Sequence, residues 1–583
     1  MRKFSPILFL AVVAVLLSGC DLKKMAKKHD TVKYETKPAV LEAHGGAVKV
    51  EVNGTFPVKY FGKAVTVEFQ PVLKYDGGTL PLKKIIIVGE KVVQGEGTVI
   101  KKKDGGAFTF TDQFVYLPEM MVSELWVTPT ATKGKKTVTL GEVKLADGVI
   151  VTSERIAKDE EVQIAPHGYE KVVIITKKSN LYFDYNSANL SMSQKLNKMQ
   201  QNIDAIKEMK SFIEQGLEIK DVMINAWASP EGELTVNAKL SEDRGKAAEK
   251  WLVSYFNDLD NKKAKEMKVK VGEIKRQYTL AVSAKGEDFD GFMSAIQASS
   301  IPEKQAIINV IKMQPSKIAR EQEIKNMSVI YAEVEAILEP LRRSEIVVNC
   351  FEPKKSDEEI AQLAITDPSK LNEKELLYAA TMTDDMATQL KIYQAASQTF
   401  PESWKGFNNA GAILLKMGNT KEAESYVEKA NALSPNNGVV LNNMGVIASQ
   451  KKDSKSAMKY FEQAKQAGVN VDYNQGVLKI RNGDYEEALR LFSGKSCTYN
   501  IALAQVLAGK TTEAVKTIEC MKVQTADGQY LLAIIGARSA NTSMMYDNLK
   551  KACAQDAKFK AEAKKDREFL KYHDSSDFQN AVK

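Results

Sequence analysis

The side chains that carry most enzyme and metal chemistry are scarce in this sequence. Its 583 residues include only four histidines and five cysteines. The four histidines are scattered along the chain and none begins a His-Glu-x-x-His motif: His29, His44, His167 and His573. There is also no Cys-x-x-Cys pair, no glycine–lysine phosphate loop and no Gly-x-Gly-x-x-Gly that opens a helix. We therefore expect no catalytic residue, no metal and no cofactor. A hydrolase whose triad assembles from distant residues is an alternative.

The composition is that of an ordinary globular protein with several domains. Apolar residues make up 44% and charged residues 27%, which excludes a disordered or collagen-like chain. The 82 basic and 74 acidic residues leave a formal charge of +8, a small excess for this length. The charge therefore gives no reason to expect a nucleic-acid partner.

The N-terminus has the order of a bacterial export signal. Arg2 and Lys3 precede an apolar run, residues 6–17, that is too short to span a bilayer comfortably. The run ends in Leu-Ser-Gly-Cys at residues 17–20, which resembles a lipobox. The resemblance implies that residues 1–19 are removed and that Cys20 is acylated. An ordinary signal peptide with an incidental cysteine is the alternative.

Residues 20–38 follow as an acylated tether rich in lysine. A basic segment next to a lipid anchor can contact anionic headgroups, although a solvated linker is an equally good interpretation. Some Gram-negative lipoproteins reach the cell surface through an acidic run after the cysteine. Because this run is basic, we expect the protein on the periplasmic face of the outer membrane.

Two domains of different pattern follow the tether. In residues 39–160, valines and phenylalanines alternate with polar residues, and Asp-Gly-Gly turns at 76–78 and 104–106 separate the runs. This pattern predicts an antiparallel β-sandwich. In residues 161–350, predicted strands alternate with amphipathic helices, which indicates helices packed on one sheet. Residues 289–340 read as a helical insertion.

One stretch of this second domain resembles a known family. Residues 228–244, ASPEGELTVNAKLSEDR, resemble the peptidoglycan-binding motif of OmpA-like domains, and Gly286-Glu287 and Leu341-Arg342-Arg343 resemble later motifs of that family. Five residues of the stretch sit at the family's spacing: Gly232, Asn237, Leu240, Ser241 and Arg244. The resemblance covers about residues 170–350 and implies an OmpA-like α/β domain.

The resemblance also implies a ligand. The family grips the diaminopimelate residue of the peptidoglycan stem peptide, with an arginine on its carboxylate and an aspartate on its amine. The arginine maps onto Arg244, whose planar fork suits a carboxylate. The aspartate maps onto Ser229, which has no charge, so Glu231 would have to reach the same point. Peptidoglycan binding through Arg244, Ser229, Glu231 and Asn237 is one hypothesis, and a domain that keeps only the fold is the other.

The C-terminal part of the chain contains an internal repeat. After a charged linker at residues 351–372, small residues recur 34 apart, as in Gly411 and Gly445, and Asn-Asn-Ala-Gly at 408–411 echoes Asn-Asn-Met-Gly at 442–445. This period resembles the tetratricopeptide repeat, and we expect residues 373–583 to form an all-α solenoid. Its concave groove would bind partner proteins, or the solenoid would serve only as a rigid arm.

Cys497 and Cys520 fall near neighbouring ends of one predicted helical hairpin. An oxidising compartment would allow a disulfide between them, and two buried thiols are the alternative.

Together these features predict an outer-membrane lipoprotein with three folded domains. We expect a scaffold, or an accessory subunit of an outer-membrane assembly or secretion machine, with protein partners in the repeat groove and possible contact with peptidoglycan. A simple tether between outer membrane and cell wall, without protein partners, is the alternative.

Overall fold

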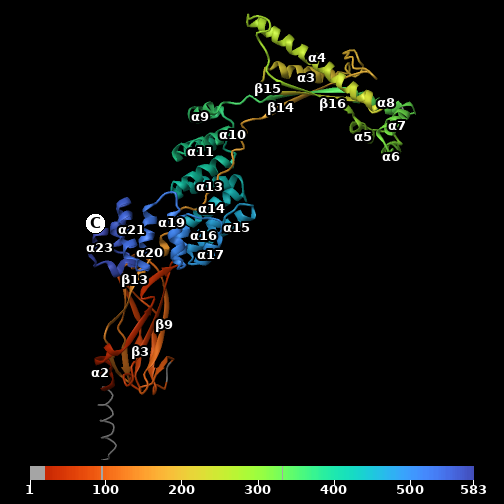
Figure 1. The fold of residues 1–583 in the computed structure, drawn as a ribbon. Coiled ribbons are helices and arrows are strands. Elements are labelled where there is room, and N and C mark those ends of the chain that lie inside the picture. The colour runs from red at the N-terminus through yellow and green to blue at the C-terminus, as the bar shows by residue number, and fades with distance from the viewer. Residues whose placement is uncertain (1–19, 94–95, 331) are drawn as a thin grey trace, which may run out of the picture. The chain divides into compact units, whose positions relative to one another are not determined.

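The structure, a computed structural model, describes residues 20–93, 96–330 and 332–583 (Figure 1). The predicted signal peptide, residues 1–19, lies outside the described residues. The chain divides into two compact units. The first unit comprises the described residues up to His167 together with Ala361–Lys583, and the second unit comprises Gly168–Ile360.

The first unit begins with two β-sheets that share one hydrophobic core. The larger sheet has the order β1-β3-β2-β13-β10-β5-β6, with β9 also paired to β3, and the smaller has the order β12-β11-β4-β7-β8. The strands are β1 (Lys33–Lys37), β2 (Val40–His44), β3 (Ala47–Phe56), β4 (Thr66–Phe69), β5 (Pro71–Tyr75), β6 (Gly78–Pro81), β7 (Ile85–Gly89), β8 (Thr98–Ile100), β9 (Gly106–Val115), β10 (Ser123–Val127), β11 (Thr130–Lys133), β12 (Lys136–Thr139) and β13 (Val143–Ile150). The predicted β-rich domain is confirmed. Two pairings, β2 with β13 and β7 with β8, are parallel, so the domain is not purely antiparallel as predicted.

The segment predicted as a tether, residues 20–38, is folded onto this domain. It forms helix α2 (Cys20–Lys27) and strand β1. Leu22 and Met25 are each only 1% exposed, because they belong to the hydrophobic core between the sheets. The carboxylate of Asp21 pairs with the ammonium groups of Lys102 (3.2 Å) and Lys133 (2.8 Å). In the sequence, this packing is indicated only by two apolar residues three positions apart, and the many lysines around them favour an exposed segment instead.

The repeats complete the first unit as a series of antiparallel helix pairs. The helices after α9 (Asp357–Thr366) are α10 (Glu373–Ala379), α11 (Met386–Thr399), α12 (Trp404–Lys416), α13 (Thr420–Leu433), α14 (Gly438–Gln450), α15 (Ser454–Gln466), α16 (Asp472–Arg481), α17 (Tyr485–Leu491), α18 (Tyr499–Leu507), α19 (Thr511–Glu519), α20 (Ala526–Arg538), α21 (Thr542–Gln555), α22 (Lys558–Ala563) and α23 (Ser576–Ala581). Helix α9 and a short 3-10 helix, Pro368–Lys370, lie inside the predicted linker, residues 351–372, so much of this segment is folded. The predicted small residues mark the helix crossings. A Cβ at Gly445 would lie 2.5 Å from the Phe461 ring.

Cys497 and Cys520 are joined by a disulfide, with their Cα atoms 5.2 Å apart. The bridge links the segment before α18 to the end of α19. Two described cysteines are outside this disulfide and have free thiols. They are Cys350 and Cys553, and both are buried.

Residues 155–165, which we call the strap, run from the sandwich along the repeats without forming helix or strand. The strap is the orange trace that passes the blue helices in Figure 1. The predicted boundary between the sandwich and the next domain, at residue 161, lies in the middle of the strap. The α/β unit instead begins at Gly168.

The second unit is a four-stranded sheet of order β14-β17-β15-β16, in which only β15 and β16 are parallel. Its elements are β14 (Ile174–Tyr182), α3 (Gln200–Glu214), β15 (Ile219–Ala228), α4 (Leu234–Glu266), β16 (Thr279–Glu287), α5 (Phe289–Ala298), α6 (Lys304–Lys312), α7 (Lys317–Ile330), α8 (Ala332–Leu338) and β17 (Arg343–Phe351). Helices α3 and α4 share a core with the sheet, whereas α5–α8, the predicted helical insertion, form a separate core. The predicted alternation of strands and helices is therefore present.

Candidate functional sites

The inner face of the repeats carries a row of buried asparagines that hold the strap. We call Asn409, Asn443, Asn474 and Asn500 the asparagine ladder; each is at most 1% exposed. Each side chain accepts a hydrogen bond from the N–H of one strap residue and donates one to the C=O of the same residue. The clamped residues are Ala165 by Asn409 (2.7 and 3.2 Å), Gln163 by Asn443 (2.8 and 2.8 Å), Glu161 by Asn474 (2.7 and 2.9 Å) and Ala157 by Asn500 (3.0 and 2.9 Å).

A second row of amides supports the ladder. Asn408 and Asn442 donate to the carbonyls of Gln163 (3.0 Å) and Glu161 (2.8 Å). The amides also bond to one another: Asn443 donates to Asn408 (2.9 Å) and Asn474 donates to Asn442 (2.9 Å). Because a buried amide without partners is costly, this continuous network fixes both the repeats and the strap.

The acidic side chains of the strap are held as well. The Glu160 carboxylate is fully buried and accepts from Ser449 (2.9 Å) and from the Arg481 guanidinium (3.2 Å). Asp159 accepts from the Tyr473 hydroxyl (2.7 Å) and from Asn500, and Glu161 pairs with Lys495. The groove therefore contacts the strap's charge as well as its backbone.

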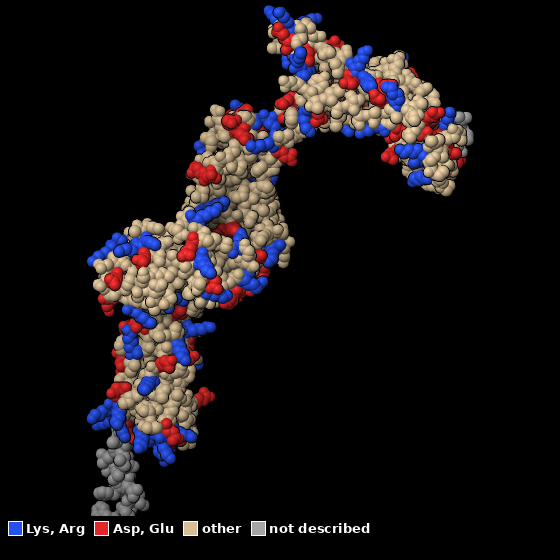
Figure 2. All heavy atoms as spheres, viewed as in Figure 1, with Lys and Arg blue, Asp and Glu red and all other residues tan. Residues whose placement is uncertain are grey.

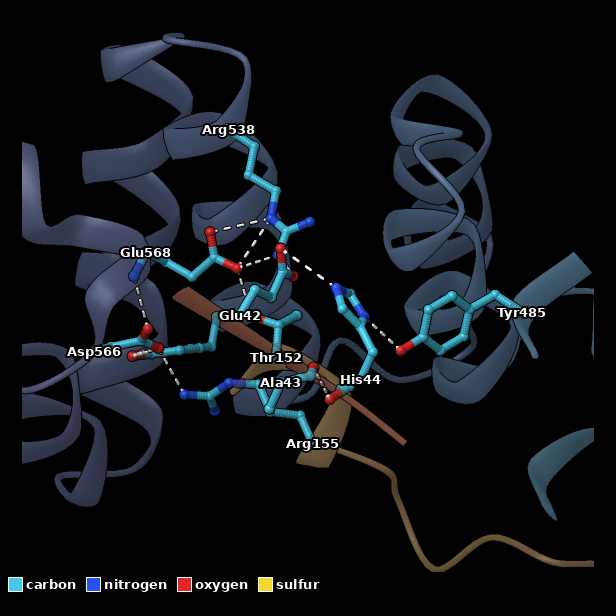
Figure 3. A network of polar contacts seen from close by, with 11 residues as sticks. Glu42, Ala43, His44, Thr152, Arg155, Tyr485, Arg538, Asp566 and Glu568 are labelled. Atoms are coloured by element: carbon cyan, nitrogen blue, oxygen red, sulfur yellow. Dashed lines mark hydrogen bonds and ion pairs between the residues drawn. The ribbon is translucent and has the colours of Figure 1, made fainter. Parts of the chain in front are cut away.

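A polar network joins the sandwich to the last helices (Figure 3). The Arg538 guanidinium lies between two carboxylates, Glu42 of β2 (2.6 Å) and Glu568 (2.5 Å), and the Thr152 hydroxyl also donates to Glu568 (2.5 Å). Arg155, at the start of the strap, pairs with buried Asp566 (2.8 Å). These contacts fix the sandwich against the solenoid within the first unit.

The backbone also comes close at this junction. Gly45 has a positive φ of 60°, and a Cβ there would lie 2.8 Å from the carbonyl oxygen of Asn482 in the repeats. Only glycine fits such a turn at this distance.

The structure therefore shows that the groove predicted to bind partner proteins is occupied along the asparagine ladder by a segment of the same chain. The ladder face contacts the chain's own strap, and a hollow of about 1150 Å³ remains beside it, lined by strap, sandwich and repeat residues. The recurring Asn-Asn pair in the sequence is therefore more than a sign of the repeat, because a buried asparagine at matching positions needs a polar partner.

The second unit has its own pocket, of about 510 Å³, and all four predicted site residues line it: Arg244, Ser229, Glu231 and Asn237. They meet because β15 ends directly before Ser229 and α4 starts at Leu234. The turn between them carries Ser229 and Glu231, and the first turns of α4 carry Asn237 and Arg244. Helix α7 of the insertion adds a wall with Glu321 and Lys325, two residues that no motif in the sequence predicts as part of the site.

Arg244 is a buried cation without an anionic partner among the described residues. The side chain is 1% exposed and donates to three backbone carbonyls, those of Ser187 (2.9 Å), Trp227 (3.1 Å) and Asp184 (3.1 Å). Burial, reinforced by nearby Arg342, lowers the pKa of Arg244 to about 10. A guanidinium has five N–H donors, so two remain for a further acceptor.

Glu231 is the matching buried anion. Its Oε1 accepts from the Ser229 hydroxyl (2.6 Å) and from Arg342 (3.0 Å), so Glu231 does reach the position of Ser229. Its Oε2 is buried without a hydrogen-bond partner in the described structure. Asn237 donates to the Ser229 carbonyl (3.1 Å) and to Glu287 (2.9 Å), which braces the turn.

A carboxyl pair next to this pocket makes the second unit sensitive to pH. Burial, followed by the neighbouring Glu321 carboxyl, raises the pKa of Glu287 to about 7, against a hydrogen bond from Asn237 that lowers it. Between the ordinary pKa of glutamate, about 4.5, and pH 7, the folded unit therefore keeps a proton that the unfolded chain has lost. The free energy of unfolding should fall as pH rises through this window.

We expect Glu287→Gln to flatten that pH dependence and to stabilise the second unit at pH 8, because no charge then needs to be buried. Urea unfolding of the second unit at pH 5 and pH 8 measures the effect. An equal loss of stability in both proteins would show that another group titrates.

Comparison with known proteins identifies the repeats. Residues 405–437 and 439–467 match the tetratricopeptide repeat family. These ranges cover the α12–α13 and α14–α15 pairs, so the C-terminal helices contain tetratricopeptide repeats. No curated protein matches the chain.

Several solved structures are similar to parts of the chain. One is a tetratricopeptide repeat protein from Parabacteroides merdae (15% identity, 42% of this chain and 97% of that one, TM-score 0.29). Others are YrrB, described as a repeat protein with an unusual peptide-binding site (18%, 36% and 100%, TM-score 0.20), and the type IV pilus biogenesis factor PilW (16%, 39% and 89%, TM-score 0.21).

In the described part of the chain, no group of three or more His, Cys, Asp or Glu side chains is arranged to hold a metal ion. No described helix is both long and apolar enough to cross a membrane.

Proposed function

We propose that this protein is a lipid-anchored scaffold of the bacterial envelope that grips peptidoglycan through its second unit. Tetratricopeptide repeats are modules of protein–protein interaction, which supports the scaffold class. The finer proposal is an accessory subunit of an outer-membrane assembly or secretion machine, on the periplasmic face and without enzyme activity. It rests on the resemblance of residues 17–20 to a lipobox and of residues 228–244 to the OmpA-like motif.

The charge near the N-terminus agrees with membrane anchoring. Helix α2 exposes Lys23, Lys24 and Lys27. Its Asp21 pairs with Lys102, which lies in a turn, and with Lys133, the last residue of strand β11. Basic side chains gather at this end of the sandwich in Figure 2. Each lysine near an anionic leaflet contributes roughly 1 kcal/mol of attraction.

The pocket supplies the observation that carries the wall-binding proposal. One wall holds a buried guanidinium with free N–H donors and another holds a buried carboxylate oxygen without a partner. A ligand with a carboxylate and an ammonium group would satisfy both, and the diaminopimelate of a stem peptide has this chemistry. The loss of the family's aspartate at Ser229 is then compensated by Glu231.

The occupied repeat groove specifically favours the second candidate, a plain tether between outer membrane and wall. In that case the repeats act as a rigid arm and bind no partner. Purification of the native protein in mild detergent distinguishes the two, because a scaffold brings stoichiometric envelope proteins and a tether brings only muropeptides.

Binding to purified sacculi and to soluble muropeptides tests the pocket. We expect Glu231→Gln to weaken muropeptide binding at least about tenfold, since the amide keeps the Ser229 hydrogen bond but loses the charge. Arg244→Lys should have a similar effect, because lysine lacks the planar guanidinium that can donate two hydrogen bonds to one carboxylate. Lys239→Ala, an exposed change on the same helix, is the matched control. Full binding by Glu231→Gln and Arg244→Lys would show that this pocket does not bind muropeptides.

A further inference from the structure

We propose that the concave face of the repeats is a binding site for an extended acidic peptide, and that the strap is its resident ligand, which closes the site to peptides from other proteins. This inference is independent of the proposed wall binding, since it concerns the first unit alone. It commits the groove to one occupant, residues 155–165 of the same chain.

The main-chain contacts define the shape of the ligand. Glu161, Gln163 and Ala165 are clamped at every second residue, and each offers both its N–H and its C=O to one asparagine. A spacing of two is the period of an extended chain, whose alternate residues face the same side. The ladder therefore recognises an extended backbone of any sequence that can present these groups.

The side-chain contacts define the charge of the ligand. Three consecutive strap residues, Asp159, Glu160 and Glu161, meet Tyr473, Arg481 and Lys495 in the groove. The position of Glu160 is the most selective for a negative charge, because the Glu160 side chain is fully buried and pairs with Arg481. A peptide with lysine at this position would bury two like charges, which is strongly unfavourable. The groove thus selects an acidic segment.

The connection to the same chain gives the strap its advantage. It is continuous with the sandwich, which is itself fixed to the repeats by the ion pair between Arg538 and Glu42 of β2. A ligand linked in this way has an effective concentration of about millimolar or more. A free peptide at micromolar concentration would therefore compete at a disadvantage of about 1000-fold.

A peptide-exchange experiment tests the inference. The chain from residue 21 is prepared as wild type and as a variant whose strap is a Gly-Ser segment of equal length. A fluorescent peptide with the sequence of residues 155–167 is titrated into each. We expect binding to the variant and at least about 100-fold weaker binding to the wild type. The same peptide with Glu160→Lys should not bind the variant.

The variant gives a result even if it does not fold alone. In that case the peptide should restore helical circular dichroism and raise the melting temperature as its concentration increases. Adding Asn443→Ala and Asn474→Ala should abolish this rescue. Tight binding to the wild type, or neither binding nor rescue in the variant, would overturn the proposal.

Discussion

Asn443→Ala is expected to destabilise the first unit by about 3 kcal/mol or more. The side chain is fully buried and takes part in four hydrogen bonds, two with Gln163 and one each with Asn408 and Asn442. Alanine leaves the Gln163 N–H and the Asn408 oxygen buried without this partner. Each such group costs about 1–3 kcal/mol, more than a surface hydrogen bond is worth.

Native-state hydrogen exchange measures this effect, because the amides of Ala157, Glu161, Gln163 and Ala165 report on the strap directly. In the variant they should exchange faster by at least about a factor of 100, the equivalent of roughly 3 kcal/mol. Asn419→Ala is the control, since Asn419 is exposed and makes no side-chain cap bond at the start of α13. Unchanged strap protection in Asn443→Ala would contradict the ladder.

Arg538→Ala should be comparably damaging, by about 3–5 kcal/mol, through a different cause. Arg538 is the shared cation for Glu42 and Glu568, and the Glu568 side chain is only 3% exposed. Removing the guanidinium leaves two close carboxylates, one of them buried, without that positive charge. The sandwich should then separate more readily from the last helices.

Calorimetry of the chain, with and without the substitution, checks this expectation. Arg490→Ala provides the comparison, because Arg490 is 69% exposed and pairs with Glu487 one turn away, a contact worth less than about 1 kcal/mol. If both variants melted alike, the network in Figure 3 would not stabilise the junction.

The parts of the fold that sequence analysis predicted are those with strong local periodicity. The repeats follow from the recurrence of Gly411 and Gly445 at 34 residues, and these glycines do lie at helix crossings. The strap has no such signal, because its backbone bonds to side chains rather than to a neighbouring strand. Its partners are also distant, with Ala157 bound to Asn500, so no local pattern could place the domain boundary correctly.

The pocket of the second unit also has one part that a local sequence pattern predicts and one part that it does not. Ser229, Glu231, Asn237 and Arg244 are predicted by the resemblance of one short stretch to a family motif, and the sixteen residues from Ser229 to Arg244 form one turn and the start of one helix. The insertion wall was missed because Glu321 lies far along the chain and its place depends on how α7 packs. Residues 20–38 fold onto the sandwich, contrary to the predicted tether, because the burial of Leu22 and Met25 outweighs the lysines around them.

Hydrogen exchange of the full chain, with and without soluble muropeptides that contain diaminopimelate, tests the central claim most directly. We expect added protection at residues 229–244 and in α7, and a slowly exchanging strap that the ligand does not change. Protection that appeared in the repeats instead, together with release of the strap, would contradict the account. It would place the ligand in the groove and leave the pocket of the second unit without a role.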